Sequence, residues 1–92
     1  MPQPEKRTRA DRVLVDLVEA DVDIGFSLVD VATTEFCRGN PASGERALRE
    51  AEAIVTDIEQ RLLRLDSSGS APFRQLVTEL RREIDAAMPK TS

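Results

Sequence analysis

Acidic residues in the first third of the chain are the ones whose spacing could support chemistry. Four of them recur at intervals that place them on one face of a helix: Asp16, Glu19, Asp23 and Asp30. Carboxylates arranged in this way can coordinate a divalent cation. Helical bundles that bind two metal ions, however, combine carboxylates from several helices with histidine, and this chain contains no histidine. We therefore expect no metal and no cofactor, and we interpret the acidic face as solvated and suited to a basic protein partner.

Asp21 differs from these acids because it lies near the centre of an apolar helix face. A buried carboxylate needs a partner, since leaving it unpaired is costly. With the first turn centred near Pro41, residue i of the first helix faces roughly residue 82 − i of the second, which puts Arg61 opposite Asp21. We predict a structural ion pair between them; a ligand-binding or proton-transfer role for the carboxylate is the alternative. The same register puts Gly25 opposite Ile58, where the missing side chain would let the helices approach closely.

Catalysis requires a nucleophile, a base and a group that stabilises the transition state in one place. The single cysteine, Cys37, has no histidine to act as its base. The chain has no Gly-x-Ser-x-Gly turn and no glycine-rich phosphate-binding loop. These absences predict that the protein is not an enzyme. A single cysteine also cannot form an internal disulfide, so we expect a reducing, cytoplasmic location.

Composition narrows the class of partner. The 92 residues include 13 basic and 17 acidic side chains, and the formal net charge of −4 repels phosphate backbones.

Acidic residues interrupt the apolar stretch that follows the basic start, so we expect neither a signal sequence nor a membrane span. Eleven arginines against two lysines are typical of a GC-rich genome and indicate a bacterial source.

Glycine, proline and serine clusters divide the chain into three segments with the 3.6-residue apolar period of helices. We predict helices at about 10–38, 44–66 and 71–88, with Ser70 as the N-cap of the third and Pro72 in its first turn. Short connections make consecutive helices antiparallel neighbours. The predicted fold is therefore all-α, an up-down-up antiparallel three-helix bundle. It forms a single domain at 10–88 between a flexible basic tail at 1–9 and a C-terminal tail at 89–92.

The first predicted helix is apolar over more than half of its circumference. Two neighbours from the same chain leave part of so wide an arc uncovered, which suits another chain. The residues that we expect to contact it are Val13, Val15, Phe26 and Val29, together with Asp16, Glu19 and Asp23. The predicted function is a non-enzymatic helical protein-interaction or self-association module. Its partner would be a second copy, giving a dimer, or another helical protein.

A nucleic-acid-associated regulator is the alternative function. It would use an outward polar face of the third helix: Arg74, Gln75, Thr78, Arg81 and Arg82. Acidic residues on the same helix and the negative net charge disfavour nucleic acid as the partner, because specific interfaces of that kind are strongly basic. The sequence neither supports nor excludes a third function, the binding of a small ligand between the helices.

Overall fold

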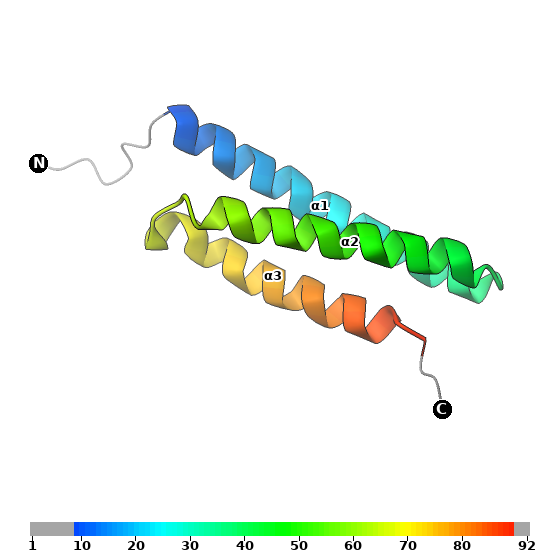
Figure 1. Ribbon diagram of the computed structural model, residues 1–92. Helices are drawn as coiled ribbons and strands as arrows, with labels where there is room; N and C mark the ends of the chain where they lie inside the picture. Colours follow the sequence, from blue (N-terminus) through cyan, green and yellow to red (C-terminus); the bar gives the residue numbers. More distant parts are fainter. Residues whose placement is uncertain (1–8, 90–92) are drawn as a thin grey trace, which may run out of the picture.

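The computed structural model describes residues 9–89, which form three α-helices and no strand. The helices are α1 (Arg9–Cys37), α2 (Pro41–Leu62) and α3 (Ser67–Ala87). They run up, down and up beside one another (Figure 1). The predicted all-α three-helix bundle is confirmed. The predicted terminal tails lie outside the described residues, apart from Arg9, which begins α1, and Pro89.

A tight turn at Gly39 joins α1 to α2. Gly39 has a positive φ of 82°, which its lack of a side chain permits. The Asn40 N–H then donates to the carbonyl of Glu35 (2.8 Å), as in a Schellman helix end. Pro41 is the first residue of α2, a position where its missing N–H has no helical partner to lose. This is why α2 begins at Pro41, three residues before the predicted start at Gly44.

The start of α3 also differs from the prediction. Asp66 is the N-cap, and its carboxylate accepts a hydrogen bond from the Gly69 N–H (2.7 Å). The helix therefore begins at Ser67, and the predicted cap, Ser70, is instead a fully buried residue of the first turn. Pro72 accordingly lies inside α3, in the second turn rather than the first. Helix α2 stops at Leu62, four residues earlier than predicted, and residues 63–65 form the turn that leads to Asp66.

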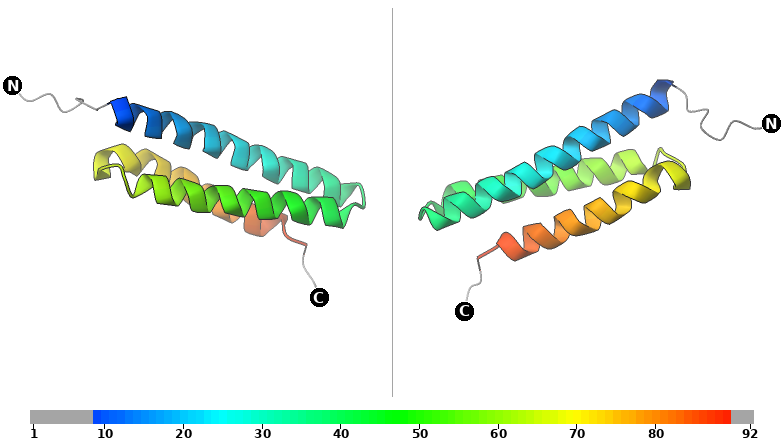
Figure 2. Two further views of the ribbon diagram at one scale, coloured as in Figure 1. Left: turned by 45° about the horizontal axis from the view of Figure 1, so that its top comes forward. Right: turned by 180° about the vertical axis from the view of Figure 1, so that it is seen from behind.

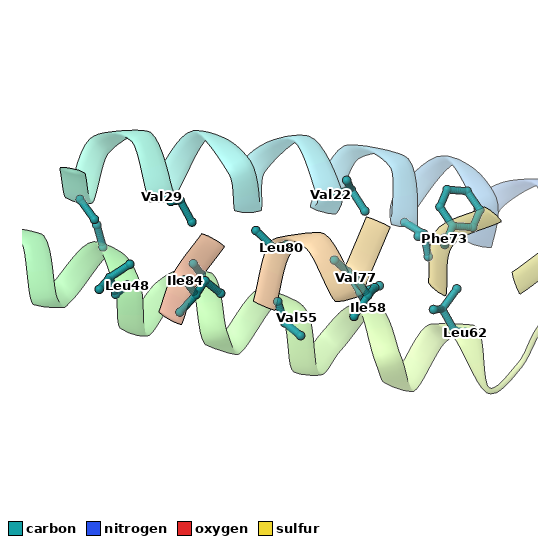
Figure 3. Packing of buried hydrophobic residues seen from close by; sticks show 14 of the residues in the cluster. Val22, Val29, Leu48, Val55, Ile58, Leu62, Phe73, Val77, Leu80 and Ile84 are labelled. Atoms are coloured by element: carbon teal, nitrogen blue, oxygen red, sulfur yellow. The ribbon is translucent and has the colours of Figure 1, made fainter. Parts of the chain in front are cut away.

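The core runs along the axis between the three helices. Figure 3 shows Val22 and Val29 pointing from α1 toward side chains of α2 and α3. Ile58 and Leu80 are the largest of its fully buried side chains. The other buried hydrophobic residues are Val18, Ala32, Ala47, Leu48, Ala51, Val55, Leu62, Leu65, Phe73, Val77 and Ile84.

Gly25 lets a neighbouring helix approach α1 closely, although the residue nearest to it is not the predicted Ile58. A Cβ atom at Gly25 would lie 2.6 Å from Cδ2 of Leu80, so a side chain of α3 fills the space that the glycine leaves. Ile58 of α2, the predicted partner, is fully buried, but the three atoms nearest to the Cβ position all belong to Leu80. The expected register relates only α1 to α2, whereas Gly25 faces the part of the core to which α3 also contributes.

A candidate protein-docking surface on the first helix

Large apolar side chains are exposed along one side of α1. Between 42% and 50% of each of the four largest is accessible to solvent. We call this surface the apolar row and define it as Val13, Leu17, Ala20, Ile24 and Val31. The buried side of α1, by contrast, is formed by residues such as Val18, Val22 and Val29. The helix therefore has two apolar sides, and only one of them is covered by α2 and α3.

The spacing of the apolar row matches that of a helix-packing seam. Its first four residues alternate steps of four and three, and Ser27 continues the alternation before Val31. At 3.6 residues per turn, such steps keep the side chains in one continuous strip. From Val13 to Val31 the strip is about 27 Å long. A second helix could lie along it at a shallow angle.

Three carboxylates follow one edge of the apolar row. We call Asp16, Asp23 and Asp30 the acidic row; they are seven residues apart, so they line up along the helix. All three are exposed. Within residues 9–89, none of them has an ion pair or hydrogen bond from its side chain. Their charges are therefore available to a partner.

A groove lies on the other side of the acidic row, between the start of α1 and the start of α3. In the right-hand view of Figure 2, these two helices lie on the near side and α2 lies behind them. The groove has a volume of about 500 Å³, and Val15, Phe73 and Leu76 give it an apolar lining. Asp16 and Glu19 also line it. Glu19, predicted to contact a partner, thus belongs to the groove rather than to the apolar row.

The apolar residues that we predicted as partner contacts lie in different parts of the structure. Val13 lies in the apolar row, exposed by 50%. Val15 is half-buried in the groove, and Phe26 is half-buried against the core. Val29 is a core residue with only 4% of its surface exposed, so its prediction as a partner contact is wrong. Its side chain points toward α2 and α3, which leaves none of it for another chain (Figure 3).

Four residues of the apolar row were not among the predicted partner contacts: Leu17, Ala20, Ile24 and Val31. Each of the three large ones lies one residue after a member of the acidic row, whose exposure indicates the solvent-facing side of α1. Val15, Val22 and Val29, however, lie one residue before the same acids, at the same angle around the helix, and they are half-buried or buried. The acids alone therefore do not indicate which of the two flanking apolar strips is exposed.

Asp21 and Arg61, predicted as a pair, are brought together. Nη1 of Arg61 donates to Oδ2 of Asp21, which joins α1 to α2. Both side chains are half-buried, with 20% of Asp21 and 32% of Arg61 exposed. The carboxylate is thus engaged by a cation of its own chain, which favours a structural role over binding of a ligand.

The residues predicted as a nucleic-acid face are partly engaged within the bundle. Arg81 donates to both carboxylate oxygens of Glu59, at 2.7 and 3.3 Å, and these hydrogen bonds raise the pKa of the guanidinium despite the opposing effect of burial. Arg74 donates to the hydroxyl of Ser70 (3.3 Å). Thr78 donates to the carbonyl of Arg74 (3.0 Å). The two remaining members, both exposed, are Gln75 and Arg82.

The described residues contain neither a metal-binding cluster nor a membrane-spanning helix. Among residues 9–89, no group of three or more Cys, Asp or Glu side chains is arranged to hold a metal ion. None of the three helices is long and apolar enough to cross a membrane. Cys37 is exposed at the end of α1.

No family model, curated protein or solved structure matches the chain.

Proposed function

We propose that the protein is a non-enzymatic interaction module that docks a helix of a protein partner on the apolar row of α1. The observation that carries this proposal is the distribution of exposed apolar side chains. Of the six large ones in residues 9–89, four lie in the apolar row, and the other two are Leu63 and Met88. Scattered exposed apolar residues are ordinary on a soluble protein, whereas a continuous strip of them is typical of a docking surface.

The bundle is suited to present such a strip. The core behind α1 holds the helix in place, so docking does not require the helix itself to fold. Recognition would then follow the helix-against-helix mode, in which side chains at steps of three and four interlock with those of the partner. The charges of the acidic row, beside the apolar row, would select among partners.

Nucleic-acid binding through α3 has less support. Glu59 engages Arg81, one of the three arginines of the predicted face. The same helix also exposes Glu79, Glu83 and Asp85. Such a mixture of charges differs from the strongly basic surfaces that bind phosphate backbones.

The proposed function can be tested with two fluorescently labelled helical peptides, each about four heptads long and so able to span the apolar row. Both carry leucine along the seam; one has lysine and the other glutamate beside it. We expect at least one peptide to bind the wild-type protein and the double variant Leu17→Glu/Ile24→Glu to lose that binding. Leu63→Glu is the matched control, because Leu63 is 76% exposed but lies outside the apolar row.

Fluorescence anisotropy measures the binding, and circular dichroism checks that each variant keeps its helix content. The proposal predicts loss of binding only in the variant of the apolar row. Equal binding by the wild type and this variant, or equal loss in Leu63→Glu, would show that the peptides bind elsewhere or without specificity.

A further inference from the structure

The two edges of the apolar row carry different side chains. When two helices pack through such seams, the residues just outside each seam face one another and determine which partner is accepted. On α1, one edge is the acidic row. The opposite edge, nearer to α2, is half-buried and consists of Leu14, Asp21, Leu28 and Glu35. Of these, Asp21 is already paired with Arg61.

A second copy of the chain fits this arrangement poorly. If two α1 helices pack antiparallel, like edges meet, so that Asp23 faces Asp23 of the second copy and Asp16 faces its Asp30. If they pack in parallel, opposite edges meet: Asp16 faces Asp21 of the second copy, which is already paired with Arg61, and Asp30 faces its Glu35, whose carboxylate lies 3.9 Å from Arg38. The antiparallel arrangement therefore places unpaired carboxylates against one another, and the parallel arrangement offers the acidic row no cation from the edge that faces it. Such like-charge contacts suppress association.

A helix with lysine or arginine beside its seam fits the same surface. Its cations would meet the acidic row, whose three carboxylates have no partner within the described bundle. Its apolar residues would cover Leu17 and Ile24. We infer that the partner is an amphipathic helix of a different protein with a basic flank, not a second copy of this chain. This inference rests on the proposed function and adds the chemistry of the partner.

The lysine and glutamate peptides described above test this inference directly. We expect the lysine peptide to bind the wild-type protein about tenfold more tightly than the glutamate peptide, or better, and added salt to reduce that difference. The variant Asp16→Lys/Asp23→Lys should reverse the preference. Both positions are exposed, so the fold should survive the change.

A second double variant, Glu45→Lys/Asp85→Lys, controls for overall charge. Like the test variant, it changes the formal net charge from −4 to 0. Glu45 lies about 160° around α2 from Arg61, which faces α1, and Asp85 lines a shallow groove between α2 and α3. We expect this control to keep the preference for the lysine peptide. The same reversal in the control would show that total charge, not the acidic row, sets the preference.

The outcomes separate the inference from the proposed function. If the wild type binds both peptides equally and Leu17→Glu/Ile24→Glu binds neither, the docking surface stands and the inference about charge is wrong. Light scattering across a dilution series adds a second criterion. We expect the chain alone to be monomeric; a dimer that Leu17→Glu dissociates would overturn the inference while supporting the docking surface. If neither peptide binds and the chain is monomeric, both proposals fail.

Discussion

The ion pair between Asp21 and Arg61 predicts a measurable coupling between α1 and α2. Because only 20% and 32% of the two side chains are exposed, water screens this pair less than one on an open surface. Exposed pairs contribute about 0.2–1 kcal/mol, whereas breaking a fully buried pair costs about 3–5 kcal/mol. This pair lies between the two cases. We therefore expect Asp21→Asn to lower the free energy of unfolding by about 1–2 kcal/mol.

A double-mutant cycle isolates the contribution of the pair. Asp21→Asn, Arg61→Gln and the double variant are unfolded in urea and followed by circular dichroism. We expect the double variant to be less destabilised than the sum of the single variants, by about 1 kcal/mol. The urea midpoints should fall with no change in slope, since the amount of surface exposed on unfolding stays the same. In thermal unfolding, about 1 kcal/mol corresponds to a decrease in Tm of about 4–8 °C.

The pair of Arg81 and Glu59 provides the matched control. It also joins two helices, but its side chains are 55% and 44% exposed. Its coupling should therefore be smaller, within about 0.2–1 kcal/mol. Additive effects of the Asp21 and Arg61 substitutions, or a coupling no larger than that of the control pair, would refute the structural role assigned to Asp21.

Four further substitutions test the fold and the exposed row. Asp66→Ala removes the cap on the Gly69 N–H and should destabilise the protein by about 1 kcal/mol in urea unfolding; unchanged stability would contradict the observed start of α3. Leu80→Ala should cost about 2–5 kcal/mol because Leu80 is fully buried. Gly25→Ala should be more favourable to stability in the Leu80→Ala variant than in the wild type, because the methyl group no longer meets the end of the Leu80 side chain; an equal effect in both backgrounds would contradict the contact. Leu17→Glu should change the free energy of unfolding by no more than about 0.5 kcal/mol, since a larger loss would place Leu17 in the core.

Several features of the fold follow from local sequence. Gly39 and the adjacent Pro41 end one helix and begin the next, and the turn between them is short enough to make α1 and α2 antiparallel. The rise of the helix then sets the register, so the pairing of Asp21 with Arg61 could be predicted. The start of α3 could not be predicted as well, because Asp66 and Ser70 are both good capping residues and local chemistry does not rank them.

The exposed surface of α1 was decided by tertiary structure alone. Its sequence determines a helix with an apolar arc wider than two neighbours can cover, and such an arc is compatible with several placements of α2 and α3. The placement depends on how side chains of all three helices fit together, as Leu80 does against Gly25. That fit buries Val29 and leaves Ile24 in solvent. Periodicity within one helix contains no information about the shape of its neighbours, so it could predict a leftover apolar strip but not its position.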